Sequence, residues 1–329
     1  MKFILVSAFL CASPVLSAAP PTDADAKAEL LVASVPRVDE LIARLKAEAS
    51  SIHDAQRRAE VLQFLDRPVF QVIVDRKKLE AEIVAKLQAE GLLPPEAKRI
   101  FSDEPPMRFA AAPGSVWLGH HSYPGGLVYH TLTNLRIGLG IAAVYKDVYG
   151  ISLDEDLIRL AALMHDAAKT VTMHWNPDGS ANGELMIAGT GAHHITMISE
   201  ALYRGWPAQT VVILASAHSP PHPGDDLEKL LKFLRAGAII SGKPYEAAGL
   251  TSDGKALARP APIEAFINHL DDHDYVFTET SLKAVAKDMD HNRKESDDYW
   301  TRDKTLSGQG DIPFYSRLLE KYGRPEQSH

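Results

Sequence analysis

The stretch Leu160-Ala-Ala-Leu-Met-His-Asp-Ala-Ala-Lys-Thr170 decides how the rest of the chain is interpreted. An apolar run typical of a buried helix ends in the pair His165-Asp166, and Lys169 follows three residues after the aspartate. A buried pair of ionisable side chains is costly unless it is paired with another charge or bound to a metal. The sequence therefore predicts that partners for this pair lie elsewhere in the chain.

Composition limits what those partners are. The chain has 329 residues, is 45% hydrophobic and carries a formal net charge of -8, so it suits one large domain or two modest ones. The acidic balance gives no support for binding a nucleic-acid backbone, which requires basic patches. Cys11 is the single cysteine and lies in a segment that we expect to be removed, so any metal site must use His, Asp or Glu. Such ligands suit Mn, Fe, Zn, Ni or Mg.

The first residues are typical of an export signal. Lys2 supplies a positive start, residues 3–10 form a short apolar run, and residues 17–19 are small, as cleavage requires. The run is too short to span a membrane. We expect residues 1–19 to be a signal peptide and the protein to be exported to the periplasm; a buried or amphipathic N-terminus is the alternative.

Apolar residues recur at helical spacing along most of the chain, and no strand-like alternation or internal repeat stands out, so the predicted fold class is all-α. A helix is expected to begin near Leu127 and to end at Gly150, and Asp154 is expected to cap the next helix. The oligomeric state is left open. The expected segments are a mobile leader over 20–36, a helical N-terminal arm over 37–115 that packs on the main domain or on another chain, a main domain over 116–245 and a helical extension over 246–329.

Histidines are concentrated in the main domain: nine of the fourteen lie between His120 and His222. Four positions fall on or at the end of different predicted helices, each with an apolar face, and a helical bundle can direct such side chains to one point. For any one of them, an ordinary buried or surface histidine is the alternative. The four positions are His130, His165-Asp166, His194 and His218.

Between the neighbours His193 and His194, helical spacing favours His194. It shares a stripe with Ile198 and Leu202, whereas His193 shares a stripe with the charged residue Glu200. We therefore expect His194 to point inward.

This ordered set resembles the HD-domain superfamily of metal-dependent phosphohydrolases, over about 120 residues from Tyr123 to Gly242. The segment Pro124-Gly-Gly-Leu-Val-Tyr-His-Thr131 looks like the first helix of the subgroup related to bacterial 3'-5' exoribonucleases. The segment Met164-His-Asp-Ala-Ala-Lys169 looks like the His-Asp-x-x-Lys segment of that subgroup. The histidines at 194 and 218 fall where many members carry two further ligands.

The resemblance also implies a closing aspartate in the helix that contains residues 234–241, where the expected position holds Gly237. Asp225, Asp226 or an acidic residue from 271–274 would be a substitute. Water in that position, a site with a single metal, or a domain without catalysis are the alternatives.

The cofactor that the resemblance implies is one or two divalent ions, with Asp166 as the shared ligand. His130 and His165 would hold one ion, and His194 and His218 the other. A single ion would use Asp166, His194 and His218.

Three further side chains are candidates for contact with the substrate. Lys169 lies one helical turn from the aspartate and would either neutralise a phosphate oxygen or pair with that carboxylate. On the loop before the site, His120 would contact the substrate and His121 would act as an acid; solvated loop histidines are the alternative. His174 and His222 are weaker candidates for contact.

The function implied by the resemblance is hydrolysis of a phosphomonoester or phosphodiester bond in a small, nucleotide-like substrate by metal-activated water. A di-iron oxygenase is the alternative with a different reaction. A degenerate domain that binds a ligand or a partner is the alternative without a reaction.

Overall fold

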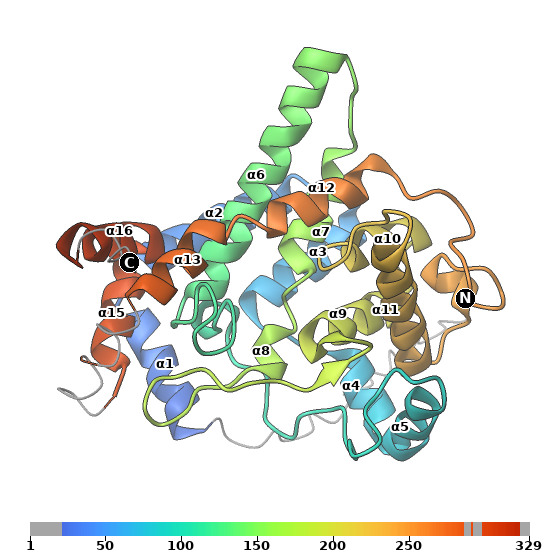
Figure 1. The fold of residues 1–329 in the computed structure, drawn as a ribbon, viewed down its shortest axis with the longest axis horizontal. Helices are drawn as coiled ribbons and strands as arrows, with labels where there is room; N and C mark the ends of the chain where they lie inside the picture. The colour runs from blue at the N-terminus through green and yellow to red at the C-terminus, as the bar shows by residue number, and fades with distance from the viewer. Residues whose placement is uncertain (1–21, 286–290, 292–297, 323–329) are drawn as a thin grey trace, which may run out of the picture.

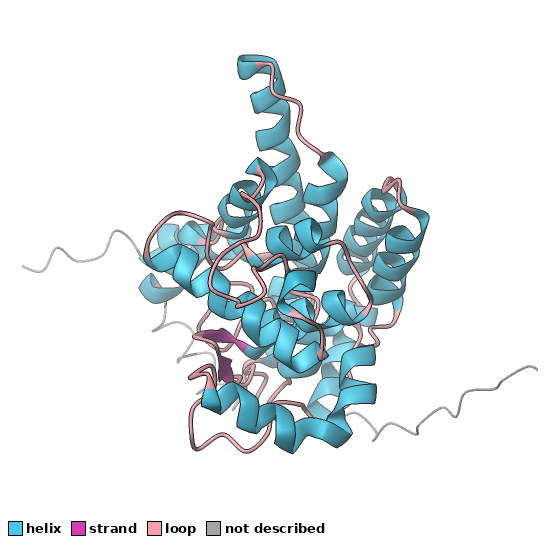
Figure 2. Cartoon of the chain, turned by 90° about the vertical axis from the view of Figure 1, so that its right-hand side faces the viewer, coloured by secondary structure: helices cyan, strands magenta, loops and turns pink. Residues whose placement is uncertain are grey.

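The computed structural model describes residues 22–285, 291 and 298–322, and this part is almost entirely helical (Figures 1 and 2). The predicted signal peptide lies outside the described residues. The named strands of the described part are β1 (Met186–Ile187) and β2 (Thr190–Gly191), a short antiparallel pair in which Met186 lies opposite Gly191. The all-α prediction is confirmed. Among the described helices, none combines the length and apolar character needed to cross a bilayer.

The helices of the N-terminal arm pack onto the rest of the protein, and their buried aliphatic side chains belong to the same hydrophobic core as the central helices. In Figure 1, α2 and α3 lie behind the central helices, and α4 and α5 lie below α9 and α11. The elements of this arm are α1 (Asp23–Ala33), α2 (Pro36–Ser50), α3 (Ala55–Asp66), α4 (Gln71–Arg76), the 3-10 turn η1 (Lys77–Leu79), α5 (Glu80–Ala89) and the 3-10 turn η2 (Phe109–Ala111).

The expected mobile leader over 20–36 is wrong from residue 23 onward, because α1 is a packed helix. The Thr22 side chain accepts a hydrogen bond from the backbone N–H of Asp25 and caps the helix. Ala28 is fully buried. The buried carboxylate of Asp25 accepts a hydrogen bond from His174 Nδ1 at 2.8 Å. A composition rich in Pro, Ala and Asp resembles a linker, but α1 packs against η2 and α15 (Trp300–Gln309), and Asp25 pairs with His174, 149 residues further along the chain.

The central helices form the bundle that the sequence predicted. The longest, α6, follows Gly125, whose φ is 90°, and ends at Gly150 in the left-handed conformation that closes many helices. Its C-terminal half projects beyond the body of the protein (Figure 1). The side chain of Asp154 caps α7 through the N–H groups of Asp156 and Leu157. The central elements are α6 (Gly126–Tyr149), α7 (Glu155–Met164), α8 (Lys169–Thr172), α9 (Ala192–Tyr203), α10 (Ala208–Ala215), α11 (Asp225–Ser241), the 3-10 turn η3 (Tyr245–Ala248) and α12 (Ile263–Asp272).

The C-terminal helices return to the start of α6. They are α13 (Val276–Ala284), α15 (Trp300–Gln309) and α16 (Asp311–Tyr322). α13 packs against α16, and α15 packs against α2 and α16. Ser307 donates a hydrogen bond to the carbonyl of Pro124 at 2.5 Å, and Tyr129 donates one to the carbonyl of Ser307 at 3.1 Å. Helix α15 therefore holds the turn from which α6 begins.

Candidate metal centre

Four buried side chains from neighbouring helices meet at one point. His130 lies near the start of α6, His165 and Asp166 follow α7 directly, and Asp272 is the last residue of α12. His130 Nε2 lies 3.0 Å from Asp166 Oδ2 and 3.1 Å from Asp272 Oδ1. His165 Nε2 lies 3.4 Å and 3.1 Å from the same two oxygens. One ligand atom from each residue lies within 4.8 Å of the others, so this group could hold a metal ion.

A second group shares Asp166 through its other oxygen. His193 Nε2 lies 3.1 Å from Asp166 Oδ1, and His218 Nε2 lies 3.8 Å from it. His218 Nε2 is also 3.6 Å from Asp272 Oδ2, so the two groups are continuous. These three ligand atoms also lie within 4.8 Å of one another. The carboxylate of Asp166 therefore faces imidazole nitrogens on both of its sides.

The structure places His193, and not His194, against Asp166. His194 points into the hydrophobic core, where its Nε2–H donates to the carbonyl of Ala215 at 3.0 Å and its ring stacks on His218 at 4.1 Å. The apolar stripe did identify the face of α9 that meets the core. It did not identify the site, because the opposite face is buried too and includes Glu200, which is 0% exposed.

The closing carboxylate is Asp272 and not a residue of α11. Gly237 lies where α11 packs closely on α9, and a Cβ there would stand 2.4 Å from Ile198 Cγ2. The expectation that position 237 belongs to the site is therefore wrong. The acidic run over 271–274, one of the substitutes considered from the sequence, supplies the carboxylate because α12 packs against α6 and α7.

Partners outside the cluster fix the orientation of its histidines. Glu184 accepts hydrogen bonds from His193 Nδ1 at 2.5 Å and from the His193 backbone N–H at 2.8 Å. His165 Nδ1 lies 3.2 Å from the carbonyl of Ala162, and His218 Nδ1 lies 2.9 Å from Thr190 Oγ1. In each ring the other nitrogen, Nε2, points at the carboxylates. Metal-binding histidines are commonly held in this way.

Two buried atoms of the second group test whether a cation fits. Asp166 Oδ1 and His193 Nε2 face each other, yet neither has a hydrogen-bond partner of acceptable geometry within the described residues. Leaving buried polar atoms unpaired costs free energy. A divalent cation between a carboxylate oxygen and imidazole nitrogens would satisfy both atoms, and the donor set suits zinc and other borderline ions.

Electrostatics keep the carboxylates ionised. Burial acts to raise the pKa of Asp166, but the charges of Lys169, His165 and His193 outweigh it and hold that pKa well below the usual range. For Asp272, burial is likewise outweighed, chiefly by His165, and the pKa is lowered. Burial also acts to lower the pKa of His193, but Glu184 and Asp166 raise it to about 9. The two adjacent buried carboxylates, Asp166 and Asp272, are thus stabilised in their ionised form by the lysine and histidines around them.

The remaining predicted side chains occupy different places. The Lys169 ammonium pairs with Asp166 Oδ2 and donates to the carbonyl of Gly114, while its side chain also lines the cavity beside the cluster. His120 lines this cavity. The ring of His121 is buried behind His120, and the two Nδ1 atoms lie 3.0 Å apart. His174 bonds to α1, so it serves the fold.

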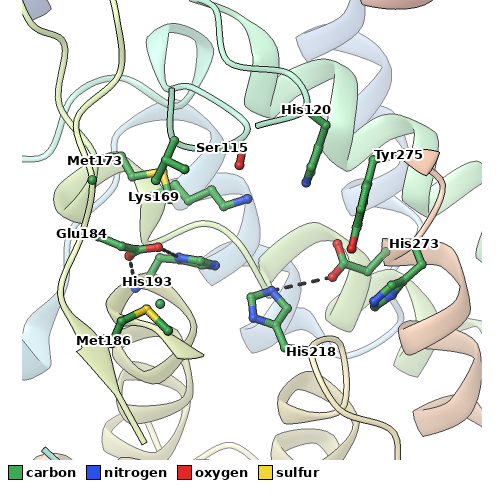
Figure 3. Close-up of a pocket in the computed structure, with 14 residues that line it drawn as sticks. Ser115, His120, Lys169, Met173, Glu184, Met186, His193, His218, His273 and Tyr275 are labelled. Atoms are coloured by element: carbon green, nitrogen blue, oxygen red, sulfur yellow. Dashed lines mark hydrogen bonds and ion pairs between the residues drawn. The ribbon is translucent and has the colours of Figure 1, made fainter. Parts of the chain in front are cut away.

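A cavity of about 550 Å³ lies beside the two groups and is lined in part by His193, His218 and Asp272 (Figure 3). His120 and Tyr275 form one wall, with their rings stacked at 4.2 Å and an interplanar angle of 6°. Met173 and Met186 contribute apolar surface on another side, near Glu184 and His193. Sequence reasoning predicted His120 but missed most of the other lining residues. The acidic run over 271–274 was the only signal for His273. The cavity lining missed from the sequence includes Ser115, Met173, Glu184, Met186, His273 and Tyr275.

A helical bundle with a histidine on one helix, a His-Asp pair after the next and a closing aspartate is the arrangement of an HD domain. The family model described as HD domain matches residues 127–271, so this part of the chain is an HD domain. The match extends past residue 245, where the main domain was expected to end, and stops immediately before Asp272. The predicted resemblance to the HD superfamily is confirmed; the exoribonuclease-related subgroup stays a prediction.

The chain is also similar to a curated protein, the dihydroneopterin 2',3'-cyclic phosphate phosphodiesterase of Methanocaldococcus jannaschii. The two are 35% identical over 114 residues, which cover 34% of this chain and 44% of the relative. The matched segment therefore spans less than half of the relative's length. No solved structure is significantly similar to the chain.

Proposed function

We propose that this protein is a metal-dependent phosphohydrolase that cleaves a phosphoester bond in a small substrate. The observation that carries the proposal is the buried cluster in which Asp166 is shared by two groups of metal-ligand type at the base of a cavity. The HD domain and the similarity to a cyclic-phosphate phosphodiesterase support it. Because that relative acts on a phosphodiester, a diester is the first substrate to test.

The cofactor in this proposal is a pair of divalent ions of Mn, Fe, Zn, Ni or Mg. Bound ions of this kind polarise phosphoryl oxygens, acidify water and stabilise the charge of the transition state. Asp166 offers one oxygen to each side, which suits two neighbouring ions. The first ion would be held by His130, His165, Asp166 and Asp272, and the second by Asp166, His193 and His218.

Different residues around the cluster would bind different parts of the substrate. Lys169 brings a positive charge to the cavity wall, where it would neutralise a phosphate oxygen. Met173 and Met186 offer apolar surface to the organic part of the substrate. A cavity of about 550 Å³ has room for a nucleotide-sized molecule. The absence of basic clusters in the sequence disfavours a polynucleotide.

The test is hydrolysis of bis(4-nitrophenyl) phosphate and of a nucleoside 2',3'-cyclic phosphate by protein loaded separately with each of the five ions. We expect turnover with at least one ion, and loss of both bound metal and turnover in Asp166→Ala. Asp147→Ala, which removes an exposed aspartate near the end of α6, is the matched control and should keep both. Full turnover by Asp166→Ala would refute the proposed site.

Two other results would replace the proposal. Bound iron with oxygen consumption and without phosphoester cleavage would make the protein a di-iron oxygenase. Purified protein that binds none of the five ions would make it a ligand-binding or partner-binding module.

We also propose that the protein acts outside the cytoplasm, on phosphoesters found there. The support is the sequence of residues 1–19 alone. Cell fractionation with N-terminal sequencing tests it, and an intact N-terminus in the cytoplasmic fraction would contradict it.

A further inference from the structure

The C-terminal helix α16 reaches the wall of the cavity through a line of three side chains. Asp311, its first residue, places Oδ2 at 3.4 Å from His121 Nε2. On the other side of that ring, His121 Nδ1 lies 3.0 Å from His120 Nδ1. His120 lines the cavity, and its ring extends toward the cavity interior beside Tyr275 (Figure 3).

The middle residue of this line, His121, is buried in a constrained backbone conformation. His121 is 4% exposed and has a φ of 56°, a left-handed conformation that side chains rarely adopt. Two glycines make room for it. A Cβ on Gly114 would lie 2.5 Å from His121 Cβ, and a Cβ on Gly126 would lie 1.9 Å from the His121 carbonyl oxygen. A strained and buried histidine indicates that the surrounding structure holds this ring in place.

The carboxylate of Asp311, at the far end of this line, directs one oxygen at His121. Asp311 Oδ1 accepts the backbone N–H of Ile312 at 3.1 Å. Asp311 Oδ2 is buried, faces His121 and has no hydrogen-bond partner of acceptable geometry among the described residues. An ionised carboxylate only accepts hydrogen bonds. The carboxylate of Asp311 therefore favours a proton on His121 Nε2.

We propose that Asp311 and His121 are positioning residues that set the tautomer of His120, so that an unprotonated His120 Nε2 faces the reacting centre. With the proton of His121 on Nε2, its Nδ1 accepts a hydrogen bond from His120 Nδ1–H. The free lone pair of His120 Nε2 then accepts a hydrogen bond from the attacking water. His121, predicted from the sequence to be the acid, acts through His120, which touches the substrate side. This role rests on the proposed phosphohydrolase function; the order of protons along the three residues does not.

The substitution Asp311→Asn gives a defined prediction. The Asn oxygen would stay on the N–H of Ile312, so its amide NH₂ would face His121 and donate to Nε2. The protons of both rings would then move to the opposite nitrogens, and His120 Nε2–H would point into the cavity. Glu320→Gln, an exposed change in the same helix, is the matched control.

Nitrogen-15 NMR of histidine-labelled protein reads the tautomers directly, with Zn²⁺ as the added ion and with His120→Ala and His121→Ala used to assign the signals. We expect His120 protonated on Nδ1 and His121 on Nε2 in the wild type and in Glu320→Gln, and the reverse in Asp311→Asn. A proton on His120 Nε2 in the wild type, or unchanged tautomers in Asp311→Asn, would overturn the proposal. The ligand atoms of His120, His121 and His130 also lie within 4.8 Å of one another. An additional bound ion that is lost in His121→Ala would therefore overturn the proposal too, because these three histidines would then be a metal site.

Kinetics provide the second readout. Asp311→Asn should lower kcat by about 10–100-fold, the size typical of residues that orient a functional histidine, and leave KM and bound metal within about twofold of the wild type. An equal fall in metal content would mean that Asp311 only supports the fold. If the wild type hydrolyses no phosphoester, the proposed function fails, while the NMR signals still decide the order of the protons.

Discussion

Glu184 offers the sharpest test of how the second group is held. Its carboxylate accepts two hydrogen bonds from the same residue, His193, through the ring Nδ1–H and the backbone N–H. In Glu184→Gln one acceptor oxygen remains for two donors. If that oxygen stays on the backbone N–H, the amide NH₂ faces Nδ1 and moves the ring proton to Nε2. That nitrogen points at Asp166 Oδ1 from 3.1 Å, so the proton would occupy the position of the ion.

The magnitude follows from comparable sites, in which loss of the residue that orients a metal-binding histidine weakens metal affinity 10–100-fold. This corresponds to about 1.4–2.7 kcal/mol of binding free energy. The assay is a competition titration of Mn²⁺ or Zn²⁺ against a chromogenic chelator, with Glu82→Gln on α5 as the exposed control. Wild-type affinity for both ions in a folded Glu184→Gln protein would refute the assignment of His193 as a ligand.

Two further predictions separate site from fold. His193→Ala should lose bound metal and keep most of its thermal stability. His194→Ala should keep the metal and lose on the order of 2 kcal/mol of unfolding free energy, because a buried stacked ring is removed. The opposite pattern in metal analysis and urea unfolding would make His194, and not His193, the ligand. Asp25→Ala should cost about 1–3 kcal/mol for each buried donor it leaves unpaired. Burial acts to lower the pKa of His174, but the hydrogen bond to Asp25 outweighs it and raises that pKa. The contribution of this pair to the free energy of unfolding is therefore complete below the unfolded-state pKa of about 6.5. It is lost as the pH rises through the pKa of His174 in the folded protein. Urea unfolding at pH 6 and pH 9 should therefore show a stability gap between wild type and Asp25→Ala that narrows at the higher pH, and a gap that widens would contradict the ion pair.

The helical pattern carried much of the information about the fold. Periodicity and turn residues located α6 and α7, because Gly150 and Asp154 end and begin helices by local chemistry that needs no tertiary context. The same local rules placed His130 on a helix and His165 and Asp166 at a helix end, and the structure brings these side chains together.

Choices that depend on tertiary packing did not follow from local patterns. An amphipathic stripe could not decide between His193 and His194, because α9 is buried on both faces. The closing carboxylate was expected within the same run of helices, yet Asp272 arrives from a polar segment whose path between α6 and α10 no local signal specifies. Glu184 lies in a loop, and loops carry no periodicity to place a side chain.

The separation of the ligands along the chain has a consequence for how the protein acquires its cofactor. The contact between His165 and Asp272 closes a loop of 107 residues. Because a long loop must be closed before its contacts stabilise it, the complete ligand set can exist only after α12 has docked. Metal binding would then be coupled to that docking step. The ion that occupies the site would be chosen by the ions available where folding finishes, and not by those present where the chain is synthesised.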